Sequence, residues 1–309
     1  MNKTTHLLYV PFTGLGLYGG HRGQRWLRNR IKIFKQFVLK SLQSQTDKDF
    51  ILWVSWRYED RGDKMIVELE EYIKSLGIRT IFTYSGVCFW DDKYDDVMAR
   101  QRLLEAVHGS MGEVINVIGD CENVLMTIQP SDDCYRSIAV GEIKQVFEHD
   151  KSLQVFGYKS GYVMDYMSQK LCEWNPKTTP PFYTIKFPRE TFIDPLKHLL
   201  YTGPYKSHEF VKDYLKALYV DSRGFLVGTH GFNISTVFDH PYAGRECDLE
   251  LLSFFGLSGV EKLVLPLSIR NIIFRKLPYG VKRKLRYWAG EKVWILRPLF
   301  SVIYNYLRA

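Results

Sequence analysis

Two adjacent aspartates follow the apolar run Val124–Ile128, in the turn Ser131-Asp132-Asp133. In an open α/β sheet, ligands bind beyond the carboxyl ends of the strands, so a ligand is expected at such a turn. Carboxylate oxygens are the ligands that Mg²⁺ or Mn²⁺ prefers, and such a cation can offset the charge of a departing diphosphate. We predict a nucleotide-diphosphate site, in which Asp133 binds the divalent cation (Mn or Mg) and Ser131 and Asp132 contact the nucleotide. The alternative is a turn whose aspartates cap the next helix.

A histidine occupies a similar position later in the chain, where His230-Gly231-x-Asn233 follows a predicted short strand, Gly224–Thr229. An imidazole at a strand end can bind the same cation or orient a phosphate, and Gly231 permits close approach of the backbone. We therefore predict His230 as a second metal ligand. The alternative is a turn that carries a surface histidine.

A glycine-rich stretch, residues 13–20, is followed by several arginines. The planar guanidinium fork matches phosphate oxygens, so Thr13, Arg22 and Arg25 are predicted to contact the donor. Arg102, on a predicted helix before the acidic turn, is a further candidate. The alternative for these arginines is a solvated surface. The stretch does not have the spacing of a P-loop, which excludes that fingerprint.

Three groups between the acidic turn and His230 are candidates for a catalytic base. They are Asp194, His208 and Glu209. A general base must lie within hydrogen-bonding reach of the proton that it removes, and spacing along the chain does not separate the three.

The first half of the chain alternates between short apolar runs and segments of helical periodicity. The predicted strands are His6–Val10, Phe50–Ser55, Thr80–Tyr84 and Val124–Ile128, and the helices between them are Arg30–Ser44, Ile66–Leu76 and Asp95–His108. This alternation predicts an α/β fold with a mostly parallel central sheet flanked by helices. The acidic turn is expected at the mouth of that sheet, with His230 beside it.

The second half is less regular. We predict a hairpin of Gln154–Tyr158 and Tyr162–Tyr166 around Lys159-Ser160-Gly161. Asn175–Pro188, rich in proline and threonine, is predicted to be a loop or lid, and Ser207–Leu218 a helix.

The composition is that of a folded protein in a reducing compartment. Of the 309 residues, 46% are hydrophobic and 25% charged, which indicates a globular chain. The five cysteines are scattered, so no C-x-x-C zinc or redox site is present. No signal peptide and no apolar run of about 18 residues is recognisable, so we expect a cytoplasmic protein without a membrane-spanning helix.

The net charge of +8 is concentrated at the C-terminus. Residues 270–309 contain ten lysines and arginines and one acidic residue, Glu291. Tryptophan and leucine lie among these cations at helical spacing, which predicts an amphipathic helix on an anionic membrane surface. The alternative is a terminal helix docked on the body. Because the body itself is not basic, we expect no nucleic-acid partner. We place a catalytic domain at 1–265 and the basic amphipathic region at 266–309.

A longer pattern runs from Arg30-x-x-x-Phe34-x-x-Phe37 through Ser41-Leu42-x-x-Gln45-Thr46 to Asp49-Phe50. With the acidic turn and Thr229-His230-Gly231-x-Asn233, it resembles the rhamnosyltransferase-like branch of GT-A glycosyltransferases, which is glycosyltransferase family 2-like. The resemblance covers about Leu7 to Val237. This chain has Pro130 or Gln129 where the family has its first metal-side aspartate. The end of the second predicted strand, Trp56 to Asp60, lacks the aspartate that many GT-A enzymes use to bind the base, and Glu59 or Asp60 is the candidate substitute.

The resemblance implies a GT-A fold, a nucleotide-diphosphate sugar donor and a divalent cation. It implies an enzyme, a hexosyltransferase of polysaccharide biosynthesis that transfers a sugar to a glycan or lipid-linked acceptor. With the basic C-terminal region, we expect a peripheral protein on the inner membrane face. The alternative is a non-catalytic domain of the same fold that binds a sugar nucleotide or scaffolds partners.

Overall fold

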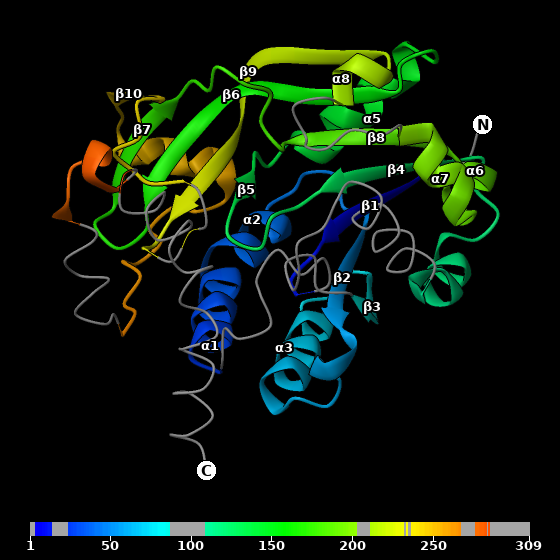
Figure 1. Cartoon of the computed structure of the whole chain (residues 1–309), viewed down its shortest axis with the longest axis horizontal. Coiled ribbons are helices and arrows are strands. Elements are labelled where there is room, and N and C mark those ends of the chain that lie inside the picture. The colour runs from blue at the N-terminus through cyan, green and yellow to red at the C-terminus, as the bar shows by residue number, and fades with distance from the viewer. Residues whose placement is uncertain are drawn as a thin grey trace.

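The computed structural model describes residues 4–13, 24–86, 109–202, 211–231, 233, 236–266, 276–282 and 284. The strands within these ranges are β1 (Thr4–Val10), β2 (Ile51–Arg57), β3 (Thr80–Gly86), β4 (Asn123–Ile128), β5 (Cys134–Tyr135), β6 (Val155–Asp165), β7 (Lys170–Trp174), β8 (Tyr183–Pro188), β9 (Ala217–Thr229) and β10 (Ala243–Glu246). All ten belong to one sheet (Figure 1).

Several helices accompany the sheet in the described ranges. They are α1 (Gln24–Ile33), α2 (Leu39–Gln43), α3 (Lys64–Ser75), α5 (Ala139–His149), α6 (Arg189–Ile193), α7 (Pro195–Thr202) and α8 (Val211–Tyr214), with a π-helical turn η1 (Phe34–Val38) and 3₁₀ helices η2 (Tyr58–Asp60) and η4 (Leu249–Phe255). Residues 109–118 are also helical. α1, η1 and α2 follow one another without a break. Together they correspond to the helix predicted at Arg30–Ser44, which in the structure begins earlier, at Gln24.

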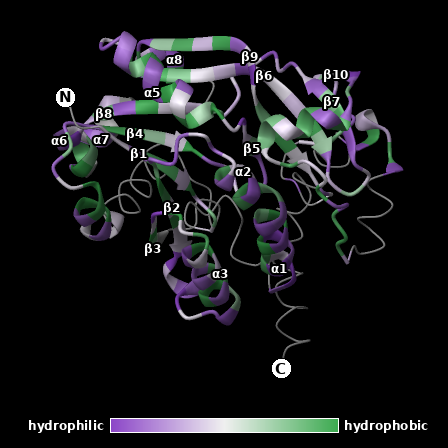
Figure 2. Ribbon diagram, turned by 180° about the vertical axis from the view of Figure 1, so that it is seen from behind, coloured by the Kyte–Doolittle hydropathy of each residue, from purple (hydrophilic) through white to green (hydrophobic). Residues whose placement is uncertain are grey.

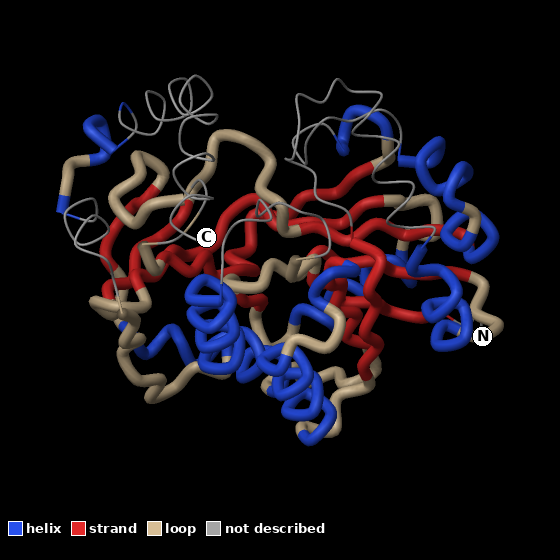
Figure 3. The backbone as a smooth tube through the Cα atoms, turned by 60° about the horizontal axis from the view of Figure 1, so that its bottom comes forward, coloured by secondary structure: helices blue, strands red, loops and turns tan. Residues whose placement is uncertain are grey.

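The first half of the sheet is parallel, in the order β3-β2-β1-β4. Alternate side chains of its strands face opposite layers. Leu8 and Val10 pack with side chains of α1, η1 and α3, whereas Leu7 and Tyr9 pack with those of residues 109–118. Helices therefore lie on both sides of the strands (Figure 3). Hydrophobic and hydrophilic positions alternate along α1 and α3, as expected for helices with one buried face (Figure 2).

The second half reverses direction at β8, which is antiparallel to both β4 and β6. β6 in turn pairs with β9 in parallel. Two reversals restore the original direction, so β4, β6 and β9 end at the same edge of the sheet as β1, β2 and β3. The predicted α/β class, a central sheet flanked by helices, is confirmed. The sheet is mixed, and its parallel order is concentrated in the first half.

The predicted hairpin at residues 154–166 is wrong, because β6 continues through Lys159-Ser160-Gly161 as one strand. The register against β9 shifts on both sides of Ser160. A Cβ on Gly161 would lie 2.4 Å from the carbonyl oxygen of Phe225. Gly161 therefore lies at an irregularity of β6 where β9 approaches closely. A glycine required for this reason gives the segment the composition of a turn.

The structure corrects two further secondary-structure predictions for the second half of the chain. The predicted loop 175–188 ends in β8, which pairs with β4 inside the sheet. The predicted helix 207–218 is helical at α8 within its described part, and β9 already begins at Ala217. The predicted helix 95–108 lies outside the described residues. None of the helices in the described ranges is long and apolar enough to cross a membrane.

Residues 257–266 follow η4 and lie along α1. The side chains of Leu263 and Leu265 are buried in the core that α1 and α3 share with the sheet. From α1, the side chain of Lys32 donates a hydrogen bond of 2.9 Å to the carbonyl oxygen of Val264. The segment just before the predicted boundary at 265 is thus packed into the body.

Candidate functional site

The predicted meeting of the acidic turn with His230 is confirmed. The turn follows β4 and leads into β5, which pairs antiparallel with β9 in the register Cys134↔Leu226. This pairing lays the turn beside the end of β9, directly after which His230 follows. His230 Nε2 lies 3.1 Å from Asp132 Oδ2, although 98 residues separate the two.

The segment His230-Gly231-x-Asn233 forms a tight turn that faces Asp132. Gly231 has φ of +80°, a conformation that favours glycine. The backbone N–H of His230 donates to Asn233 Oδ1 at 2.8 Å. The Asn233 amide in turn donates to the Gly228 carbonyl at 2.6 Å and to Asp132 Oδ2 at 3.3 Å. The asparagine thus links the end of β9 to the acidic turn.

A buried arginine from α1 completes the surroundings of Asp132. Arg30 Nη1 lies 2.5 Å from Asp132 Oδ2, and the two side chains are 1% and 11% exposed. The Arg30 guanidinium also lies 5.5 Å from the ring centroid of Trp26. Because arginine is almost never fully buried unless it is paired, this ion pair is a structural requirement of α1 as well as a feature of the site.

Asp133 points to the backbone of β9. Its Oδ1 accepts a hydrogen bond of 2.8 Å from the N–H of Gly228. A Cβ on Gly228 would lie 2.3 Å from both the Asp132 carbonyl oxygen and the ring of Tyr166. Glycine at this position therefore permits the close approach on which the Asp133 hydrogen bond depends.

Two side chains, those of Tyr166 and Gln129, donate hydrogen bonds to the backbone of the acidic turn. The Tyr166 hydroxyl donates to the Asp132 carbonyl at 2.9 Å, and the Tyr166 ring stacks on Phe37 with centroids 3.6 Å apart. The Gln129 amide donates to the Asp133 carbonyl at 2.8 Å. Phe37 belongs to η1, so the same continuous helix that supplies Arg30 also supports the turn.

The two aspartates have opposite electrostatic surroundings. Burial alone raises the pKa of Asp132, but the charge of Arg30 and the hydrogen bond with His230 outweigh it and lower this pKa to about 2. Burial and the neighbouring Asp132 charge raise the pKa of Asp133 well above its usual value. Burial lowers the pKa of His230, in opposition to Asp132. At neutral pH the Arg30–Asp132 pair is therefore charged while His230 is neutral.

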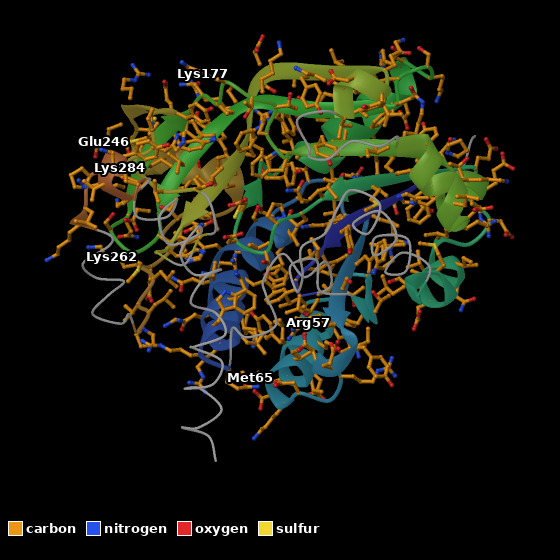
Figure 4. All side chains as sticks on the ribbon, in the orientation of Figure 1. Arg57, Met65, Lys177, Glu246, Lys262 and Lys284 are labelled. Carbon is orange, nitrogen blue, oxygen red and sulfur yellow. The ribbon has the colours of Figure 1, made fainter. Side chains whose placement is uncertain are left out.

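A second polar cluster lies at the ends of β1 and β2, along the same edge of the sheet. Thr13 Oγ1 donates to Asp60 Oδ2 at 2.5 Å and accepts from the backbone N–H of Arg57 at 3.0 Å. The Arg57 side chain pairs with Asp60 at 3.1 Å. Figure 4 shows Arg57 near the end of β2, with Met65 on the neighbouring α3. The predicted donor-binding residue Thr13 thus shares this cluster with Asp60.

Two residues of this edge were missed in the sequence. Asp165 ends β6 opposite Thr229 of β9, and so adds a carboxylate beside His230. The sequence predicts Asp165 as part of a hairpin. Arg30 belongs to the long family-like pattern, but nothing in that pattern indicates an ionic partner. An arginine among the apolar positions of an amphipathic helix is a signal that could have suggested one.

Three of the remaining predicted site residues, Asp194, Arg25 and Ser131, lie in the described part of the chain, and four lie outside it. Asp194 follows α6, the short helix directly after β8. The end of β8 pairs with the beginning of β4, so Asp194 lies at the opposite edge of the sheet. Its carboxylate accepts from two backbone N–H groups of α7, and we correct its predicted catalytic role to that of a helix cap. Arg25 is exposed and donates to the Pro266 carbonyl. Ser131 is buried in the acidic turn. Arg22, Arg102, His208 and Glu209 lie outside the described residues.

The contacts of the acidic pair do not fit the predicted cation. Asp132 Oδ2 already receives Arg30, His230 and the Asn233 amide. His230 Nε2, a nitrogen that would bind a metal, is directed at that oxygen. In the part of the chain that the structure describes, no group of three or more His, Cys, Asp or Glu side chains is arranged to hold a metal ion.

Comparisons with known proteins give a distant likeness. No protein-family model and no curated protein match the chain. Among solved structures, it is similar to residues 1–349 of TarS from S. aureus in complex with UDP-GlcNAc, with 12% identity, a TM-score of 0.41, and coverage of 74% of this chain and 59% of that one. For TarS 1–349 alone the values are 15%, 0.38, 73% and 60%. The chain thus spans about three-fifths of these structures, and at these TM-scores any assignment of function rests on the residues themselves.

Proposed function

We propose that this chain is a glycosyltransferase that moves a sugar from a nucleotide-diphosphate donor to a hydroxyl of a glycan or lipid-linked acceptor. The observation that carries the proposal is the meeting of Asp132, His230 and Asn233 at the carboxyl edge of the sheet. These residues come from the two distant motifs by which the sequence resembles the rhamnosyltransferase-like GT-A branch. Their contact supports the view that the motifs form one site.

The arrangement of the edge is suited to an extended donor. Thr13, Arg57 and Asp60 at the ends of β1 and β2 offer donors and acceptors for a nucleoside. The acidic turn and His230 lie at the ends of β4 and β9, where the reacting diphosphate and sugar would follow. Ligands of open α/β sheets bind along this kind of edge.

The proposed reaction needs a base as well as a donor site. The acceptor oxygen would attack the anomeric carbon, the bond from that carbon to the diphosphate would break, and a base would take the hydroxyl proton. His208 and Glu209 remain predictions for that base. Asp165 is an added candidate, because it lies beside His230 at the edge where the reaction would occur.

Turnover of a panel of sugar nucleotides tests the proposal. The chain would be incubated with UDP-, GDP-, CDP- and dTDP-sugars, and release of nucleoside diphosphate measured with and without glycan acceptors. Asp133→Ala is expected to lose turnover, whereas Asp221→Ala, a matched removal of an exposed carboxylate on β9, retains it. Absence of both turnover and binding for every donor would refute the proposal.

A non-catalytic sugar-nucleotide-binding domain is the second candidate. It is favoured by the acidic pair, because one oxygen of Asp132 is paired with Arg30 and one oxygen of Asp133 accepts from the N–H of Gly228. Tight binding of a donor without turnover on any acceptor would support it over the enzyme.

We also propose that the basic region 266–309 attaches the protein to an anionic membrane surface on the cytoplasmic side. In its described part, Lys282 pairs with Asp239 at 2.8 Å and Tyr279 packs on His240 with ring centroids 4.8 Å apart. These contacts would hold the start of the region on the body. Cosedimentation with phosphatidylglycerol vesicles, lost on truncation after residue 284, is expected. Salt-sensitive binding to RNA or DNA instead would contradict the expectation of no nucleic-acid partner.

A further inference from the structure

We infer that the guanidinium of Arg30, and not a divalent cation, supplies the positive charge at the acidic turn, so that nucleoside diphosphates bind this site without metal. The inference rests on the proposed function for the identity of the ligand. It concerns a positioning residue, since Arg30 acts on the site through Asp132.

Arg30 is built into the site. Its side chain projects from the buried side of α1, is 1% exposed and lies against Trp26. A charge in this position requires a permanent partner, and Asp132 provides one at 2.5 Å. A cation that took over Asp132 would leave the guanidinium buried without that carboxylate.

The oxygen that pairs with Arg30 is contacted by three nitrogen-bearing side chains. Asp132 Oδ2 is also approached by His230 Nε2 at 3.1 Å and by the Asn233 amide at 3.3 Å. A divalent cation there would face the guanidinium and two further nitrogens. Like charges at such separations repel strongly in a buried site.

The second aspartate is engaged from the other side. Asp133 Oδ1 accepts from the N–H of Gly228, and the Gly228 backbone is wedged between the Asp132 carbonyl and the Tyr166 ring. β9 therefore has no room to move closer, and its pairing with β5 resists movement away. One oxygen of each carboxylate is thus taken by protein donors.

The first experiment measures binding of UDP, GDP, CDP and dTDP to the full chain by calorimetry, in excess EDTA and then in Mn²⁺. We expect the Kd of the nucleotide that binds to change by less than about threefold between the two conditions. Weakening by about tenfold or more in EDTA, restored by Mn²⁺, would overturn the inference and leave the proposed function standing.

The second experiment measures Mn²⁺ alone, by the electron paramagnetic resonance signal of the free ion. In the wild-type chain we expect no Mn²⁺ site that depends on Asp132, so Asp132→Asn should leave Mn²⁺ binding unchanged. In Arg30→Met, which leaves Asp132 without its cation, we expect Mn²⁺ binding to appear. Arg30→Lys retains a charge and is expected to behave as wild type, and Lys40→Met removes an exposed charge from α2 as a matched control.

The outcomes separate the two proposals. If no nucleoside diphosphate binds in any condition, the proposed function fails, and the Mn²⁺ measurement still decides the role of Arg30. A wild-type Mn²⁺ site that is lost in Asp132→Asn overturns the inference. If Arg30→Met does not fold, Arg30→Lys and the EDTA comparison on the wild-type chain retain the test.

Discussion

Replacing each aspartate of the acidic turn by asparagine should have very different effects on stability. Asp132→Asn removes the charged partner of Arg30, whereas Asp133→Asn removes a carboxylate whose ionisation burial opposes. The two positions are adjacent and the substitutions are identical, so each variant is the control for the other. The difference depends on the ion pair of Arg30 with Asp132.

The magnitude follows from the burial of this pair. With side chains 1% and 11% exposed and nitrogen and oxygen 2.5 Å apart, solvent screens the interaction little. Removing one partner of a buried pair typically costs about 3–5 kcal/mol, because the other charge is left uncompensated. For Asp133→Asn we expect a change within about 1 kcal/mol or a small gain, since the amide oxygen can still accept from Gly228.

The pH dependence gives an independent check on the sign. Folding lowers the pKa of Asp132 from 3.8 to about 2. At pH values above the unfolded pKa, this shift contributes about 2 kcal/mol to the free energy of unfolding. That contribution is lost as the pH falls through 3.8 toward 2. The pKa of Asp133 is raised, so its contribution has the opposite sign and stability increases as its carboxyl becomes protonated. Asp132→Asn should therefore lose less stability in acid than the wild type.

Urea unfolding, followed by tryptophan fluorescence at neutral and acidic pH, measures both effects. The midpoint should fall clearly for Asp132→Asn and remain near wild type for Asp133→Asn. Equal destabilisation by the two variants, or a loss below about 1 kcal/mol for Asp132→Asn, would refute the assignment of the buried charge to the Arg30–Asp132 pair.

Substitutions at three further positions test other parts of the structure. Gly228→Ala should destabilise the fold by about 1–3 kcal/mol in urea unfolding, because its Cβ would lie 2.3 Å from the Asp132 carbonyl and the Tyr166 ring; unchanged stability would contradict this close approach. Phe37→Ala should cost about 3–5 kcal/mol, since a buried ring stacked 3.6 Å from Tyr166 is removed, and Phe37→Leu should recover part of it. Asp194→Ala should cost about 1 kcal/mol through loss of a helix cap and leave donor turnover unchanged; a large loss of turnover would return this residue to the site.

The second half of the chain shows where local pattern misleads. Lys159-Ser160-Gly161 has the composition of a turn, yet it lies within β6 because β9 packs closely on Gly161. The proline-rich segment after Asn175 has the composition of a loop, yet its last residues form β8 within the sheet. In both cases, strand pairing with a distant segment outweighs local preference.

The sequence by itself determined the alternation of strands and helices in the first half, and with it the α/β fold. It also predicted that the acidic turn and His230 would meet, because strands that run in one direction present their ends at one edge of a sheet. Only the tertiary structure decided the partners at that edge. The direction of Arg30 depends on how α1 is rotated against the sheet, and the place of Asp194 depends on the reversal at β8. Such contacts arise from packing between distant segments, which spacing along the chain does not encode.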